Sequence, residues 1–573
     1  SKPIPMQFKQ SLVRLALILL PISGFSQITF LPQGDKSAML LDRLEIRAYK
    51  DSLFNFSKTR PLSRQHVMNA LLSADGKNRL LLNNRVAKSM TKVDQYNLRR
   101  IMANNMEYLP DSLRSAFQAK KPFLKNFYTS PANLYEVHVK DFDLVINPVI
   151  QVTVSKEKDN SESLFQNTRG LTLRGRIANK IGFATYLTDN QERVPFYVRD
   201  FVTARHAVPG AGFYKSFKGT GYDYFDARGY LTFNVTRYID VAFGYDRNFI
   251  GNGHRSLFLS DFGNSNLFLK LNTRIWKFNY QNLFMELHNA DNRLGDRLIG
   301  KKYAAMHHLD VAVTKWLNVG LFEGVVFGRP NRFDFGYLNP IIFYRSVEQQ
   351  NGSFDNSVAG LDVKANLPHK IQVYGQLMLD EFLLSEIKNN RGWWANKWGL
   401  QFGAKYIDAF GIPNLDLQLE HNRVRPFTYS HRDSVANYTH YNQPLAHPLG
   451  ANFREWIAIA RYQPAPKWLI TGKLIAYTQG RDSSDRSFGS NIFYPNVAPF
   501  RQADFGYEIG SGWKTAVFIG SFLVSYEWKE NLFFELSALV RKQETKTAPI
   551  VSGNTSVISL GLRWNMHRRE FDF

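Results

Sequence analysis

Most of the chain alternates apolar and polar residues with a period of two, the pattern of a β-strand whose two faces meet different surroundings. The segment 267–284 is a clear example. Leu267, Leu269 and Leu271 alternate with other residues, and a short turn at Thr273–Arg274 leads into a second alternating run. Two alternating runs joined by a short turn predict a β-hairpin.

The same unit recurs from Asp141 to Met566 and predicts about eighteen strands. The first begins near Asp141, and the others are expected near 168–177, 180–188, 224–234, 238–246, 266–273, 275–285, 303–313, 316–326, 356–367, 368–381, 395–407, 414–424, 452–463, 466–480, 514–527, 531–543 and 555–566. Short connections such as 178–180 alternate with long ones such as 425–451. Outer-membrane barrels have short periplasmic turns and long outer loops, so we expect an all-β, closed antiparallel barrel.

Aromatic residues change the picture from a generic β-protein to a membrane one. They make up 14% of the chain, including 45 Phe and 27 Tyr. A soluble, aromatic-rich sandwich is the alternative, but alternation through most of the chain favours a barrel with aromatic girdles. The mean hydropathy of −0.31 fits, because polar lumen, loops and turns dilute a lipid face only one residue wide.

The first residues have the pattern of an export signal. Two basic residues precede the short apolar core Leu15–Ile22, and the small residues Gly24 and Ser26 suit a cleavage site. Residues 6–26 are therefore predicted to be a signal peptide that directs the chain towards the outer membrane.

Between the signal peptide and the barrel the period changes. Met39, Leu40 and Leu44 recur at helical spacing, and similar runs follow. We expect a periplasmic helical region over 27–135 and the barrel, with long extracellular loops, over 136–573. The loops at 247–265 and 425–451 are expected to be exposed on the outside.

The charge and cysteine content of the chain limit the classes of binding partner that we expect. There is no cysteine, and the formal net charge is +23. A basic chain often binds nucleic acid, but here the basic residues are dispersed, so anionic envelope partners such as lipopolysaccharide or acidic glycans fit better. The terminal Phe573 resembles the signal read by the barrel-assembly machinery.

Three loop segments carry a resemblance to a known family: Gly244–Phe262, Tyr337–Asp362 and Tyr438–Asn452. Together they resemble the Wzi family of outer-membrane capsule-assembly proteins, and its RemB-like, gliding-associated branch in Bacteroidetes. The resemblance implies a barrel of about eighteen strands with a periplasmic helical bundle. It also implies lectin-like binding of capsular polysaccharide or exopolysaccharide at the cell surface.

One loop has the mixture of side chains that sugars require, namely polar groups for hydroxyls and aromatic rings for apolar sugar faces. The candidate glycan-binding residues are Tyr245, Arg247, Asn248, Phe249, Asn252, His254 and Arg255. The alternative is that such residues tie loops together and plug the lumen. That alternative is at least as suitable for Arg345, Glu348 and Asp355.

Catalysis finds little support in the sequence. His307 and His308 are adjacent on a strand and must face opposite ways, and four further histidines near one loop show no metal-ligand spacing. Asp416 and Glu420 share a polar strand face, where acids commonly pair with Lys or Arg. We therefore expect no enzyme, cofactor or metal site; a porin-like channel is the main alternative function, and an outer-membrane enzyme a more distant one.

Overall fold

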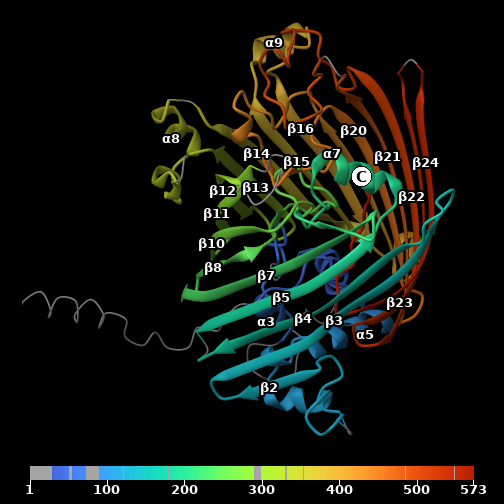
Figure 1. Ribbon diagram of the computed structural model, residues 1–573. Coiled ribbons are helices and arrows are strands. Elements are labelled where there is room, and N and C mark those ends of the chain that lie inside the picture. Colours follow the sequence, from blue (N-terminus) through green and yellow to red (C-terminus); the bar gives the residue numbers. More distant parts are fainter. Residues whose placement is uncertain are drawn as a thin grey trace, which may run out of the picture.

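The computed structural model (Figure 1) describes residues 29–50, 54–72, 89–119, 122–178, 180–289, 298–329, 332–352, 354–483, 486–547 and 549–573. The predicted signal peptide at 6–26 lies outside the described residues.

The predicted barrel is confirmed, because the strands close into one antiparallel sheet in which the last strand pairs with the first. The eighteen long strands are β3 (Phe142–Glu157), β4 (Leu164–Ile177), β5 (Ile181–Arg193), β7 (Gly221–Thr236), β8 (Ile239–Asp246), β10 (Asn266–Ile275), β11 (Phe278–Asn289), β12 (Gly300–Ala312), β13 (Leu317–Phe327), β14 (Asn356–Leu367), β15 (Ile371–Glu381), β16 (Lys397–Tyr406), β17 (Leu415–Val424), β20 (Phe453–Tyr462), β21 (Trp468–Arg481), β22 (Trp513–Lys529), β23 (Leu532–Thr545) and β24 (Val551–Trp564). Two short strands add to the sheet at the ends of the barrel: β2 (Tyr135–Val139) pairs with β3, and β6 (Lys215–Phe217) pairs with β7.

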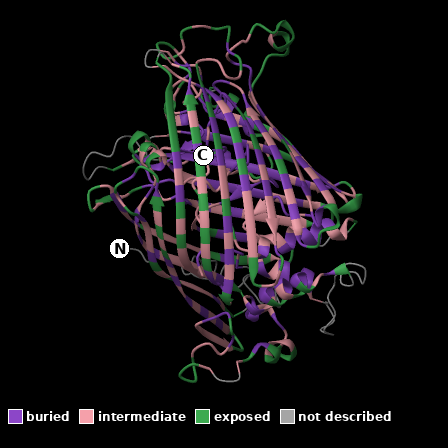
Figure 2. Ribbon diagram, turned by 90° about the vertical axis from the view of Figure 1, so that its right-hand side faces the viewer, coloured by how far each residue is buried: buried purple, intermediate pink, exposed green. Residues whose placement is uncertain are grey.

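Alternation along each strand separates an apolar outer face from a polar inner face. On β17, Leu415, Leu417 and Leu419 point outward, and Leu419 is 50% exposed. Asp416 and Gln418 between them are buried inside. The same alternation of exposed and buried residues runs along neighbouring strands in Figure 2. A register slip of one residue would exchange the two faces, so the hydrophobic pattern fixes the register.

One end of the barrel, here called the turn end, has only short connections between strands, whereas the other, the loop end, carries all the long ones. The loops contain α7 (Phe196–Arg205), η3 (Phe335–Leu338), α8 (Tyr344–Gln350), α9 (Leu384–Asn389), η6 (Ser434–Ala436) and the small strands β9 (Phe249–Ile250), β18 (Thr439–His440) and β19 (Gln443–Pro444). The turns contain η4 (Pro368–Lys370) and η5 (Ala409–Gly411).

The N-terminal region is helical, as its period suggests. It contains α2 (Ser37–Ala48), β1 (Thr59–Arg60), α3 (Arg64–Leu71), α5 (Lys92–Ala103), η1 (Met106–Tyr108), α6 (Asp111–Arg114) and η2 (Ser115–Phe117). The Ser63 hydroxyl accepts from the His66 N–H at the start of α3, and Thr91 and Asp94 form a capping box at the start of α5. None of the helices in the described ranges is long and apolar enough to cross a membrane.

These helices sit in the turn end of the lumen, held there by ion pairs with the barrel wall. Arg43 on α2 contacts Asp408 at 2.8 Å and also Asp416, while Arg100 on α5 contacts Glu527 at 2.7 Å. All of these side chains are nearly or wholly buried. The N-terminal region is therefore fixed inside the turn end of the barrel.

The assignment of the two faces can be tested at one outward position. We expect Leu419→Arg to impair insertion, since Arg at the bilayer midplane on a lipid face costs roughly 2–4 kcal/mol. Leu419→Phe should insert normally, and so should Thr471→Arg, which places the charge in the lumen cavity described below. The measurement is folding yield into liposomes by heat-modifiable gel migration. Equal yields for Leu419→Arg and Thr471→Arg would contradict the assigned faces.

Candidate functional site

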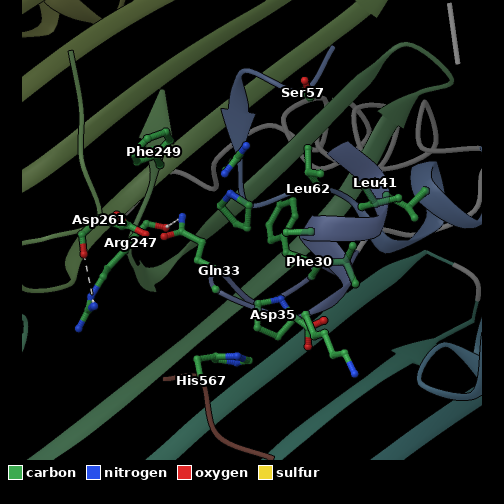
Figure 3. Close-up of a pocket in the computed structure, with 18 of the residues that line it drawn as sticks. Phe30, Gln33, Asp35, Leu41, Ser57, Leu62, Arg247, Phe249, Asp261 and His567 are labelled. Carbon is green, nitrogen blue, oxygen red and sulfur yellow. Dashed lines mark hydrogen bonds between the residues drawn. The ribbon is translucent and has the colours of Figure 1, made fainter. Parts of the chain in front are cut away.

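The barrel encloses a cavity of about 1320 Å³ between the N-terminal helical region and the segments that fold inward above it. Figure 3 shows Phe30, Gln33 and Asp35 from the N-terminal region facing Arg247, Phe249 and Asp261 from a loop. The cavity is therefore bounded by parts of the chain that are far apart in sequence.

The loop 247–265, which we call the inner loop, folds into the lumen instead of extending outward. Its strand β9 pairs with β1 of the N-terminal region in a two-stranded antiparallel sheet. The Gly251 N–H donates to the Lys58 carbonyl at 2.8 Å. The loop 425–452 packs above it, where the Tyr438 hydroxyl donates to the Phe258 carbonyl at 2.6 Å. The expectation of exposure is wrong for the inner loop, in which every residue is buried or half-buried, whereas the loop 425–452 is mostly buried but exposes Arg432 and Ser434.

Charged groups of the wall hold the inner loop in place. The Glu420 carboxylate accepts from the backbone N–H of His254 at 2.7 Å and of Arg255 at 3.1 Å. The Arg255 guanidinium and the His254 imidazole both contact Asp572, at 3.0 and 2.8 Å. Two side chains predicted to contact sugar, Arg255 and His254, thus form part of an internal clamp with Asp572.

Asp572 belongs to the tail, residues 565–573, which turns back into the lumen after β24. Burial alone would raise the pKa of Asp572, but the charges of Arg255, Lys473 and His254 hold it well below its usual range. Phe573 packs against Phe201, with ring centroids 4.9 Å apart. Phe573 therefore does not extend β24, which ends at Trp564.

Five of the seven predicted glycan residues line the cavity, namely Arg247, Phe249, Asn252, His254 and Arg255. Asn248 is buried and accepts from the Lys270 ammonium at 3.0 Å. Tyr245 lies on the outward face of β8, the same face as the exposed Phe243. The structure thus brings most of the predicted set together and separates Tyr245 from it.

The cavity is positively charged overall. Its lining contains 18 Lys and Arg side chains but only 11 Asp and Glu side chains. Burial, and then the neighbouring charge of Arg228, lower the pKa of Arg247. Burial would raise the pKa of Asp35, but the charges of Arg100 and His567 outweigh it and lower the pKa to about 2. The lining therefore keeps Asp35 ionised and still holds more cationic than acidic side chains.

Sequence reasoning missed the lining contributed by other segments. The Phe30 and Tyr230 rings are tilted towards each other with centroids 5.0 Å apart, and the Lys270 ammonium lies 4.3 Å from the Phe30 ring centroid. Arg247 donates to the Asp261 carbonyl at 3.3 Å and to the Gly210 carbonyl. The sequence offered one indication of this lining: alternate residues of a barrel strand face the lumen, and this alternation places Tyr230 and Lys270 inside.

The three residues predicted to pack a loop or plug the lumen lie elsewhere. Arg345 and Glu348 form an ion pair on α8, and Asp355 binds Arg329 at 2.7 Å and the Tyr337 hydroxyl at 2.6 Å. They hold a loop together, but that loop lies against the outside of the wall, so it does not plug the lumen.

The histidines of the loops are engaged individually. His447 contacts Glu455 at 2.7 Å, and the His440 Nε2 lies 3.0 Å from the Ser265 carbonyl. Within the residues that the structure describes, no group of three or more His, Cys, Asp or Glu side chains is placed to hold a metal ion.

The clamp can be tested by removing its cation. We expect Arg255→Ala to destabilise the folded barrel by up to about 3–5 kcal/mol, because it leaves Asp572 and Glu455 buried with one cation fewer. Arg391→Ala is the control, since the Arg391–Glu386 pair lies on the loop that carries α9, where Arg391 is half exposed to water, and it should contribute about 0–1 kcal/mol. The measurement is urea unfolding in detergent. Equal losses in the two variants would show that the clamp does not stabilise the fold.

The structure is similar to that of Wzi from Escherichia coli, an outer-membrane protein involved in group 1 capsule assembly and described as a carbohydrate-binding β-barrel, with 14% identity and a TM-score of 0.55. The match covers 94% of this chain and 100% of that chain. OprD from Pseudomonas aeruginosa gives 12% identity, coverage of 74% and 96%, and a TM-score of 0.40.

No curated protein matches the sequence significantly. Residues 227–538 match the family model described as capsule assembly protein Wzi. Because this match spans more than half of its length, the chain belongs to the Wzi family of capsule assembly proteins.

Proposed function

We propose that the protein is an outer-membrane surface protein that binds capsular polysaccharide or exopolysaccharide without catalysing a reaction. The observation that carries the proposal is the cationic, aromatic-containing cavity inside a barrel of this family. The loop end would face the cell surface and the turn end the periplasm, as short turns and long loops do in such barrels.

The lining suits an acidic sugar polymer. Arginine presents a planar fork that matches a carboxylate, and its hydrogen bonds to an anion are stronger than neutral ones. Phe30, Phe249 and Tyr230 provide rings for the apolar faces of sugars. The volume exceeds the roughly 300–1,000 Å³ of small-molecule sites, so it has room for several sugar residues.

A porin-like channel is the alternative. A wide barrel conducts only if its lumen stays open. Here the N-terminal helices, the inner loop and the tail all occupy the lumen, and β1 and β9 join two of them. This arrangement favours a binding protein over an open pore.

Three further parts of the proposal concern the envelope. Export through a signal peptide at 6–26, insertion by the barrel-assembly machinery and contact with lipopolysaccharide would accompany an outer-membrane location. Polymer binding would also suit a role in gliding, as the RemB-like resemblance implies, because adhesion and movement both require surface polymers.

The binding proposal predicts that cavity cations retain the polymer. We expect Arg247→Gln combined with Lys270→Gln to weaken retention by at least about 100-fold, because hydrogen bonds to charged groups contribute roughly 1.5–3 kcal/mol each. The assay is polymer released from washed cells, with heat-modifiable migration to confirm folding. Arg169→Gln, outside the cavity, is the matched control. Normal retention by a normally folded double variant would exclude the cavity as the binding site.

The plugged lumen makes a separate prediction about conductance. In planar bilayers the protein should stay closed most of the time, whereas Arg255→Ala should open more often because the inner loop then keeps only the His254–Asp572 contact with the tail. Single-channel recording checks both. A steady, ohmic current through the unmodified protein would support the porin alternative.

A further inference from the structure

The loop between β13 and β14 lies against the outer wall of the barrel. Its described part, residues 332–352, is here called the strap and contains η3 and α8 (Figure 1). Tyr337 and Tyr344 are completely buried in a cluster with the outward residues Phe284 and Phe327. The Tyr337 and Phe327 ring centroids are 4.6 Å apart. The strap is therefore packed onto the face that elsewhere meets lipid.

The wall under the strap carries a row of polar residues on its outward face. Asn282, His307 and Glu323 are neighbours across β11, β12 and β13. The rows on either side are apolar or aromatic: Phe284, Ala305 and Val325 towards the loop end, and Tyr280, Leu309 and Leu321 towards the turn end. The polar row thus lies within the apolar band of the barrel, where uncovered polar groups are costly.

The strap covers this row and provides partners for it. The Arg345 N–H donates to the Glu323 carboxylate at 3.0 Å, and the Tyr280 hydroxyl donates to the Pro340 carbonyl at 2.5 Å. The His307 and Tyr344 ring centroids are 3.8 Å apart. These contacts fix the strap at the level of the polar row and not above the barrel.

The other side of the strap is apolar and uncovered. Phe335, Ile341 and Phe343 are 80%, 85% and 78% exposed. Leu321, one row towards the turn end on the same outer face, is 55% exposed. The exposed side chains of the strap thus continue the lipid-facing surface of the wall.

We propose that the strap is embedded in the leaflet on the loop side of the membrane, with Phe335, Ile341 and Phe343 among the lipid acyl chains. Continuity with the lipid-facing wall carries the proposal, since large exposed apolar patches on proteins mark membrane or protein contacts. The polar row holds the strap on the wall, and the lipid covers its apolar side. This proposal goes beyond polysaccharide binding and does not depend on it.

The absence of native cysteine allows a direct test with single spin labels. We would introduce Phe343→Cys and, separately, Ile341→Cys into the full chain and reconstitute each into phospholipid vesicles. Both side chains are largely exposed, so their replacement removes little packing. Collisions of the label with oxygen, which concentrates in the bilayer, are compared with collisions with a water-soluble nickel chelate.

Two reference positions set the scale: Leu321→Cys on the lipid-facing wall and Lys388→Cys on α9, which stands at the far end of the loops (Figure 1). We expect the oxygen-to-nickel ratios at 341 and 343 to shift to the value at 321. Ratios equal to that at 388 would overturn the proposal, because the strap would then face water. Low collision rates with both reagents, together with disulfide-linked dimers of the same variants left unlabelled, would also overturn it, because a second copy would then cover the strap.

Discussion

The interior of this closed barrel contains buried charged side chains that need countercharges. The ion pairs that they form determine how the rest of the chain is arranged. A single arginine, Arg43, forms ion pairs with three acids: Asp94 of α5 and the barrel residues Asp408 and Asp416. Buried ion pairs contribute little net stability, but removing one partner is costly. The N-terminal helices are therefore held by the wall, and the wall's acids depend on the helices for their countercharges.

The strands and the N-terminal helices could be predicted because their signals are local. Period two fixes the faces of β17 from Leu415 to Val424, and all eighteen strands appear within a few residues of their expected positions. The destination of each loop could not be predicted. Arg255 meets Asp572 across 317 positions, and β9 meets β1. Only three-dimensional closure of the barrel brings such residues together.

The candidate site shows the same division. Five of the candidate glycan-binding residues in the inner loop lie around a cavity, but the composition of the loop could not show that Arg255 and His254 are engaged with the tail. Tyr245 could have been separated from the set, since it shares outward parity with Phe243 on β8. The sequence also contained an indication that something covers the outer wall at the position of the strap. His308 faces inward to Asp362 at 2.6 Å, which turns its neighbour His307 towards lipid unless something covers it.

The N-terminal region, which enters the lumen from the turn end, and the inner loop, which enters from the loop end, meet at one small β-sheet. Because β1 from the turn end and β9 from the loop end form a single small sheet, neither can leave the lumen without exposing the backbone groups of the other. The cavity lies beside this sheet and is lined by both segments, for example Phe30 on one side and Arg247 on the other. A ligand bound there would contact elements from both ends of the barrel at once. The walls of the cavity are therefore set jointly by the segments that enter from the turn end and by those that enter from the loop end.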